Sequence, residues 1–141
     1  MKRTILLVDD DPSVREAVGE VLLQEGYTVV ALANGRVVLD VVESCHAQLA
    51  LLDLNLPNES GWEVFQKLTN HFPTLPIIIV TARSNQKFKA LAAGVGALLE
   101  KPYNFPLLLD VIKRLLEEKP ETRIARSKGS NAGLVPTVPT K

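Results

Sequence analysis

The chain has 141 residues, its 16 Lys and Arg balance its 16 Asp and Glu, and 46% of its residues are hydrophobic. This length and apolar content suit one domain with its own core. The zero formal net charge gives no general attraction to nucleic acid or an anionic membrane, and no stretch approaches the ~20 apolar residues of a membrane span. The single cysteine, Cys45, excludes an internal disulfide and fits a reducing cytoplasm, so we expect a soluble cytoplasmic protein.

Short apolar segments recur along the chain, and their hydrophobic residues are continuous rather than alternating. This pattern is typical of strands that are covered on both faces. The predicted strands are residues 4–8, 28–32, 48–52, 76–80 and 97–99.

Helical patterns lie between the predicted strands, with apolar residues repeating at three- and four-residue spacing. Asp11 and Pro12 are typical of a helix start, and Ser60 with Glu63 forms a capping box. The predicted helices run from residue 12 to Gly26, over about 35–44, from Ser60 onward, over about 85–93 before Gly94, and from Asn104 onward.

Five strands that alternate with five helices predict an α/β fold with a parallel sheet. Right-handed crossovers favour the flavodoxin-like doubly wound (βα)5 sandwich with strand order 2-1-3-4-5. We expect this domain to span residues 1–118. Residues 119–141 contain three prolines, two glycines and no periodicity, which predicts a flexible tail; a docking arm for an acidic partner is the alternative.

Polar residues stand where the predicted strands end, and the carboxyl ends of parallel strands meet at one edge of the sheet. Carboxylates placed close together repel one another, so either a cation compensates them or their side chains turn apart into water. Aspartate oxygens suit Mg²⁺, or Mn²⁺ in its place. Asp11 is interpreted as a helix cap rather than a ligand. The residues expected at this edge are Asp9, Asp10, Asp53, Thr81 and Lys101.

Four stretches carry a resemblance to the receiver domain of two-component response regulators: ILLVDDDPSVR, LALLDLNLPNESGWE, IIIVTAR and EKP. The resemblance covers about residues 3–118. It implies that Asp53 accepts a phosphoryl group from the phosphohistidine of a histidine kinase or phosphotransfer protein. It also implies that Asp10, Asp53 and the backbone carbonyl of Asn55 bind Mg²⁺, with Asp9 acting mainly through metal-bound water.

The same resemblance implies roles around the phosphoryl group. Thr81 would donate its hydroxyl, the backbone amide of Ala82 would assist, and Lys101 would pair with a phosphoryl oxygen. The bond from Lys101 to Pro102 would be cis, as is largely restricted to proline. Phosphoryl transfer would then depend mostly on positioning and on electrostatics.

The resemblance also predicts a switch, with Thr81 and residue 98 as its moving parts. Receivers usually carry Tyr or Phe at that position, whereas this chain has Leu98. Asn55 and Arg83 would tune the lifetime of the phosphoryl group. We expect a stand-alone receiver without direct nucleic-acid or membrane binding, whose output is contact with an unknown downstream protein through the fourth and fifth helices and the fifth strand.

Two other functional classes remain open at this point. A pseudo-receiver would use the same fold as a constitutive docking module, and Leu98 favours that alternative. An α/β phosphatase or hydrolase would use Asp53 as an aspartyl nucleophile, because Asp53-Leu54-Asn55 resembles the strand-terminal DxD of such enzymes. The expectation is a phosphoacceptor domain rather than an enzyme with turnover, limited to its own phosphorylation and slow dephosphorylation.

Overall fold

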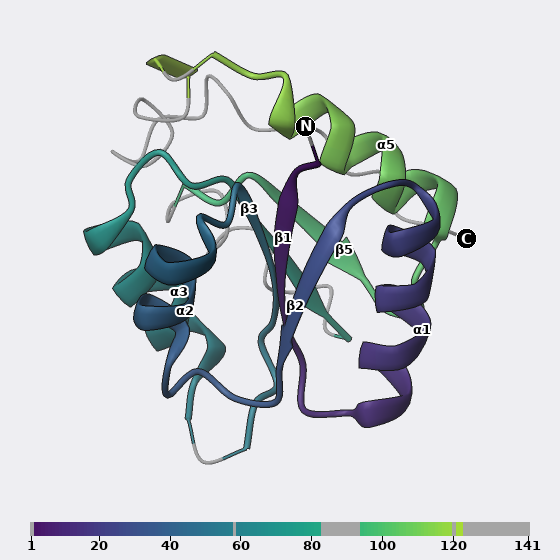
Figure 1. The fold of residues 1–141 in the computed structure, drawn as a ribbon. Coiled ribbons are helices and arrows are strands. Elements are labelled where there is room, and N and C mark those ends of the chain that lie inside the picture. Colours follow the sequence, from purple (N-terminus) through teal and green to yellow (C-terminus); the bar gives the residue numbers. More distant parts are fainter. Residues whose placement is uncertain (1, 58, 83–93, 120, 123–141) are drawn as a thin grey trace.

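The computed structural model describes residues 2–57, 59–82, 94–119 and 121–122. Five parallel strands form one sheet in the order β2-β1-β3-β4-β5, which confirms the predicted topology (Figure 1). The elements in chain order are β1 (Thr4–Val8), α1 (Pro12–Gln24), β2 (Thr28–Leu32), α2 (Val38–Cys45), β3 (Leu49–Asp53), α3 (Gly61–His71), β4 (Ile77–Thr81), β5 (Ala97–Glu100) and α5 (Phe105–Leu116).

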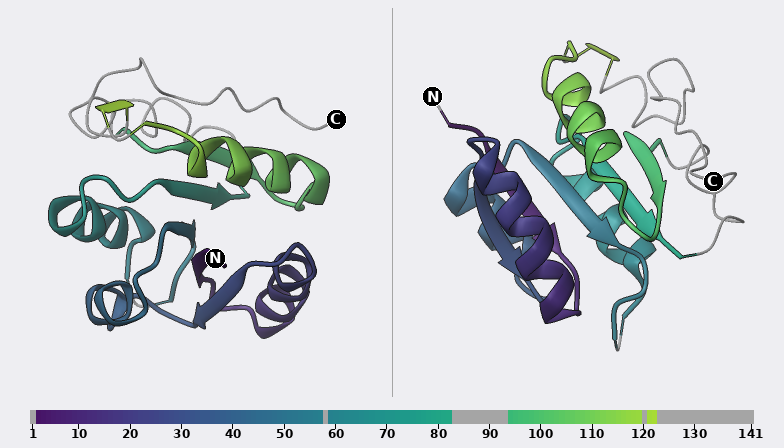
Figure 2. Two further views of the ribbon diagram at one scale, coloured as in Figure 1. Left: turned by 45° about the horizontal axis from the view of Figure 1, so that its top comes forward. Right: turned by 90° about the vertical axis from the view of Figure 1, so that its right-hand side faces the viewer.

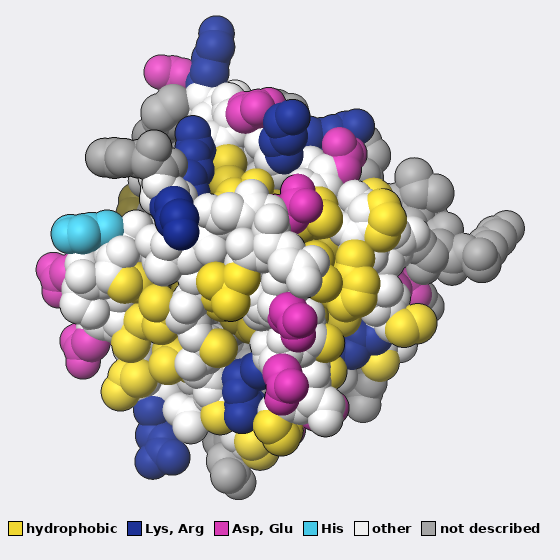
Figure 3. Space-filling view, turned by 45° about the vertical axis from the view of Figure 1, so that its right-hand side comes forward, with side chains coloured by type: hydrophobic (Ala, Val, Ile, Leu, Met, Phe, Trp, Pro, Cys, Tyr) yellow, Lys and Arg dark blue, Asp and Glu magenta, His cyan; other side chains and the backbone are white. Residues whose placement is uncertain are grey.

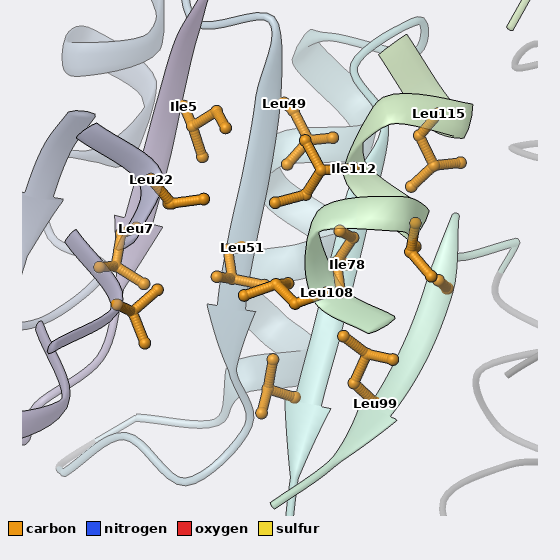
Figure 4. Close-up of a cluster of buried hydrophobic side chains, with 14 of the residues drawn as sticks. Ile5, Leu7, Leu22, Leu49, Leu51, Ile78, Leu99, Leu108, Ile112 and Leu115 are labelled. Atoms are coloured by element: carbon orange, nitrogen blue, oxygen red, sulfur yellow. The ribbon is translucent and has the colours of Figure 1, made fainter. Parts of the chain in front are cut away.

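Helices cover both faces of the sheet. Two views show α1 and α5 on one face and α2 and α3 on the other (Figure 2). Each face has its own cluster of buried side chains, because successive residues of a strand point to opposite faces. Leu7 and Leu51 pack toward α1 and α5, and Leu6 and Leu52 toward α2 and α3. Figure 4 shows the first cluster, in which side chains of α5 lie over β3, β4 and β5.

The central strands explain the continuous apolar pattern of the sequence. Every residue of β3 and β4 is buried, and so are the last four of β1. The edge strand β2 is only partly covered. The all-apolar segments therefore reflect strands that are covered on both faces, as predicted.

Three predicted helix starts are confirmed by their hydrogen bonds. Asp11 accepts the Ser13 amide hydrogen at 2.9 Å at the start of α1. Ser60 and Glu63 form the capping box of α3. Asn104 accepts the Leu107 amide hydrogen at 3.1 Å at the start of α5. These side chains satisfy amide groups that the first helical turn leaves unpaired.

Some predicted bounds are wrong. The helix expected from residue 35 begins at Val38, because the Gly35 amide bonds to Glu59 and the Arg36 amide bonds to the Asn34 side chain at 3.0 Å. The third and fourth strands lie one residue later than predicted, since the ladder continues to Asp53 and Thr81. The predicted fourth helix at 85–93, Arg83 and most of the predicted tail lie outside the described residues.

Figure 3 shows that acidic and basic side chains are interspersed on one face of the molecule. On the face that carries α1 and β2, Lys and Arg lie next to Asp and Glu, and hydrophobic side chains gather between them (Figure 3). In the part of the chain that the structure describes, every helix is too short or too polar to span a membrane.

Candidate functional site

Asp9 follows the last residue of β1 and is fully buried. Its backbone amide donates to Leu32 of β2 at 3.0 Å, which extends the sheet by one residue. Its Oδ1 accepts the Asp11 amide hydrogen at 2.9 Å. Its Oδ2 is buried and receives no hydrogen bond in the structure. The nearest cation to this oxygen among the described residues is Lys101 Nζ at 3.5 Å, too far for a short hydrogen bond. A buried carboxylate oxygen without a close donor is costly, so this oxygen fits a site for a further cation.

Asp53 ends β3, between β1 and β4, and is 2% exposed. Its Oδ1 accepts the Asn55 amide hydrogen at 3.0 Å, and its Oδ2 accepts a hydrogen bond from Lys101 Nζ at 3.1 Å. The side chain is therefore fixed at the carboxyl edge of the sheet, the lower edge in Figure 1.

Lys101 brings a positive charge to both buried aspartates. Its Nζ lies 3.1 Å from Asp53 Oδ2 and 3.5 Å from Asp9 Oδ2. Its backbone amide donates to the Thr81 carbonyl at 2.9 Å, and the bond to Pro102 is cis, as predicted. Burial lowers the pKa of Lys101, but the hydrogen bond to Asp53 and the two carboxylate charges outweigh it and raise the pKa above its ordinary value.

Three carboxylates meet at this point. One oxygen each from Asp9, Asp10 and Asp53 lies within 4.8 Å of the others, and Asp10 is exposed. Burial raises the pKa of Asp9; the Asp11 amide and Lys101 oppose this shift, and the charge of Asp53 adds to it. One lysine cannot neutralise three carboxylates. The charge, the oxygen donors and the unbonded Asp9 Oδ2 together fit a hard divalent cation such as Mg²⁺.

The other predicted residues differ in their burial and position. Thr81 is buried at the end of β4 and is paired in register with Glu100, one residue before Lys101. Asn55 is exposed in the loop after β3, and Ala82 is exposed just after Thr81. Leu98 is 5% exposed and packs in the cluster on the α2 and α3 face.

Sequence reasoning missed two side chains at the site. Arg15 donates to the Asp9 carbonyl at 2.7 Å. The sequence feature that could have pointed to Arg15 is its positive charge near the start of α1, where the helix dipole disfavours cations. Tyr103 stacks on Phe105, with ring centroids 6.0 Å apart. Burial, and then the charges of Asp9 and Asp53, raise the pKa of Tyr103. Nothing in the sequence distinguishes this tyrosine from an ordinary core aromatic.

Solved structures share this architecture. A CheY-like response regulator receiver domain protein from Methanospirillum hungatei is 33% identical, with a TM-score of 0.77, over 83% of this chain and 95% of that one. The response regulator TrrA of Thermotoga maritima, solved in complex with Mg²⁺ and BeF, is 32% identical, with a TM-score of 0.74, over 80% and 98% of the two chains.

Among curated proteins, the response regulator MprA of Mycolicibacterium vanbaalenii is 36% identical over 114 residues, 79% of this chain and 49% of that protein. A cyclic di-GMP phosphodiesterase of Thermotoga maritima is 35% identical over 107 residues, 74% of this chain and 28% of that protein. The chain thus spans half or less of the length of these two relatives.

The family model for the response regulator receiver domain matches residues 5–113, which contain β2 to β5 and all of β1 except Thr4. The fold, the acidic cluster with its lysine, and the relatives agree with this match. The chain belongs to the response regulator receiver domains of two-component signalling systems.

Proposed function

We propose that Asp53 accepts a phosphoryl group from the phosphohistidine of a histidine kinase or a phosphotransfer protein. An Asp53 carboxylate oxygen attacks phosphorus in line, the new O–P bond forms as the P–N bond breaks, and the departing imidazole recovers its neutral form with a proton from solvent. The burial of Asp53 and its fixed orientation at the sheet edge support this role. Positioning and charge neutralisation supply most of the catalysis in phosphoryl transfer.

Asp10, Asp53 and the backbone carbonyl of Asn55 would hold Mg²⁺, or Mn²⁺ in its place, and Asp9 would act mainly through water on the metal. The bound ion would neutralise charge on the phosphoryl oxygens. The proximity of the three carboxylates and the unbonded Oδ2 of Asp9 support this assignment.

The remaining site residues would hold the phosphoryl group. Lys101 already donates to Asp53 Oδ2 and would turn to a phosphoryl oxygen. Thr81 would donate its hydroxyl, and the Ala82 amide would donate beside it. The hydrogen bond from the Lys101 amide to the Thr81 carbonyl supports this, because it fixes β4 and β5 side by side.

The phosphorylated site would act as a switch for protein contact. Thr81 and Leu98 would change position and alter the face formed by β5, α5 and the helix that the sequence predicts over about 85–93, and this face would bind an unidentified downstream protein. Asn55 and Arg83 would set the phosphoryl lifetime. We further propose that this receiver acts in the cytoplasm and that the receiver domain itself binds neither nucleic acid nor membranes directly.

The observation that carries this proposal is the meeting of Asp9, Asp10, Asp53 and Lys101 at one point. Incubation with acetyl phosphate and Mg²⁺, followed by intact-mass measurement, tests it. The wild type should gain the mass of one phosphoryl group, and it should gain none when EDTA removes the Mg²⁺. Asp53→Asn should gain none, whereas Asp40→Asn, on the exposed side of α2, should behave as the wild type.

The same experiment separates the alternative classes. Full labelling of Asp53→Asn would overturn the assigned residue. A wild type that is never labelled would instead favour a docking module with a receiver fold, for which Leu98 is the supporting feature. Repeated turnover of a phosphomonoester would favour a hydrolase.

A further inference from the structure

The loop between β3 and α3 carries Asn55, and it is tied to a neighbouring loop by one carboxylate. Glu59, near the end of this loop, accepts the backbone amide hydrogen of Gly35 through its Oε1. Gly35 belongs to the loop between β2 and α2. Lys67 of α3 approaches the carbonyl of the same glycine, with 3.4 Å between Nζ and the oxygen. Both polar groups of the Gly35 peptide therefore face the segment from Glu59 to Lys67.

The close approach at Gly35 is specific to glycine. A Cβ atom there would lie 2.5 Å from Val64 Cγ2 and 2.8 Å from Glu59 Oε1, far inside normal contact distances. The Arg36 amide also donates to Asn34 Oδ1 at 3.0 Å, which shapes the turn that presents Gly35.

The position of this contact relates it to the metal site. β1 lies between β2 and β3 in the sheet, so the loops after β2 and β3 flank Asp9 and Asp10 at the carboxyl edge. α2 and α3 cover the same face (Figure 2). The contact between Glu59 and Gly35 thus joins the two loops on either side of the acidic cluster.

The other anchors of the Asn55 loop lie at its start and in its middle. At its start, the Leu54 amide donates to Val80 at 3.0 Å, and the Leu54 carbonyl accepts from Gly61 at 3.2 Å. In its middle, Leu56 is buried in the cluster beneath α2 and α3. The Asn55 amide itself bonds to Asp53 Oδ1 at 3.0 Å. Glu59 adds a polar anchor near the end of the loop, and this anchor ties it to the loop after β2.

We propose that Glu59 is a positioning residue for the metal site: by holding Gly35, it fixes the loop that presents the Asn55 carbonyl and thereby sets the affinity for Mg²⁺. This inference rests on the proposed function, because it takes the Asn55 carbonyl as a ligand. Groups that orient metal ligands without touching the ion typically contribute tenfold or more to affinity. Glu59 would do so through its reach to Gly35 rather than through its charge.

Two substitutions of Glu59 distinguish the effect of its side-chain length from the effect of its negative charge. Glu59→Asp keeps the charge but shortens the side chain by one methylene, so it cannot reach Gly35 without movement of the loop. Glu59→Gln keeps the length and the acceptor oxygen but removes the charge. The matched controls are Glu43→Asp and Glu43→Gln, at an exposed carboxylate of α2.

The dissociation constant for Mg²⁺ is measured by calorimetry, and exchange of the Gly35 amide hydrogen is measured by NMR in metal-free protein. We expect Glu59→Asp to weaken Mg²⁺ binding about tenfold and to expose the Gly35 amide to exchange. Glu59→Gln and both controls should remain near the wild type in the two measurements.

Weakened binding in Glu59→Gln with normal binding in Glu59→Asp would overturn the inference, because the effect would then be one of charge. Unchanged affinity in both variants would overturn it as well, while Mg²⁺ binding by the wild type would leave the proposed function standing. A wild type that binds no Mg²⁺ would overturn both.

Discussion

Lys101 Nζ lies 3.1 Å from Asp53 Oδ2 and donates a hydrogen bond to it. The same ammonium lies 3.5 Å from Asp9 Oδ2. In the absence of a metal, this lysine is therefore the cation closest to the two buried carboxylates among the described residues. It stabilises the carboxylates, and it also competes with any divalent ion for them.

Replacement of Lys101 with methionine should have opposite effects on stability and on metal affinity. The metal-free protein should lose roughly 1–3 kcal/mol of unfolding free energy, because two buried carboxylates lose their partner. Its dissociation constant for Mg²⁺ should fall, since a competing cation is gone, and saturating Mg²⁺ should restore much of the lost stability. Urea unfolding with and without Mg²⁺ measures both effects.

Lys113→Met provides the control for this prediction, because Lys113 is exposed on α5, away from the acidic cluster. Lys113→Met should change neither the unfolding free energy nor the dissociation constant for Mg²⁺ appreciably. Weaker Mg²⁺ binding in Lys101→Met than in the wild type would contradict the competition argument.

Acidification should stabilise the metal-free protein through Asp9. Its pKa is raised by burial in the folded state, and its ordinary value is 3.8. At a pH between 3.8 and the raised pKa, Asp9 is protonated in the folded protein but ionised in the unfolded chain. The contribution of Asp9 to stability therefore increases as pH falls through this window. Below 3.8 both states are protonated and the gain is complete.

Urea unfolding at stepped pH without metal measures this effect as a difference between proteins. The wild type should gain more stability on acidification than Asp9→Asn, which lacks the titrating group. Parallel pH profiles for the two proteins would show that Asp9 titrates normally. With Mg²⁺ present, metal affinity should decrease as pH falls through the same window, because protons compete with the metal.

The adjacent acids Asp10 and Asp11 should respond in opposite ways to substitution by alanine. Asp11 caps α1 through its bond from the Ser13 amide, so Asp11→Ala should cost about 1 kcal/mol of stability and leave Mg²⁺ affinity nearly unchanged. Asp10→Ala should weaken Mg²⁺ binding strongly with little loss of stability in metal-free protein, since it removes one of three repelling carboxylates. Calorimetry and urea unfolding of both variants check this pair, and equal losses of Mg²⁺ affinity would contradict the assignment of Asp11 as a cap.

Glycine is required at one position and dispensable at another. Gly35→Ala should destabilise the protein by about 1–3 kcal/mol, since the new methyl group would overlap Val64 and Glu59. Gly19, inside α1, has open space where its Cβ would be, so Gly19→Ala should stabilise by about 0.5–1 kcal/mol. Chemical unfolding of both variants tests the contrast, and a stable Gly35→Ala protein would show that the two loops can separate freely.

The meeting of Asp9, Asp53 and Lys101 could be predicted because each strand end is marked by its own short sequence pattern. Asp9, Asp53 and Lys101 each follow or end a short apolar run, and parallel strands bring such ends to one edge regardless of their separation in the chain. The helix starts at Asp11, Ser60 and Asn104 were predictable for the same reason, since a cap depends only on the next few residues.

The contacts that the sequence did not predict join residues far apart in the chain without a recurring pattern. Glu59 bonds to Gly35, which lies 24 positions earlier in the chain. Gly35 therefore lies in the loop before α2, which begins at Val38. Tyr103 gains its place beside the acids from the packing of α5. Only the folded arrangement shows that Glu59 and Tyr103 have these partners.

The proposed function depends on Asp9, Asp10 and Asp53 sharing one divalent cation. A crystal soaked in Mn²⁺ and measured for anomalous scattering tests it most directly. We expect a single strong peak at the carboxyl edge of the sheet, bonded to Asp10, Asp53 and the Asn55 carbonyl, and no such peak in Asp53→Ala. A peak elsewhere on the molecule, or no peak at saturating Mn²⁺, would overturn the assignment of this metal site.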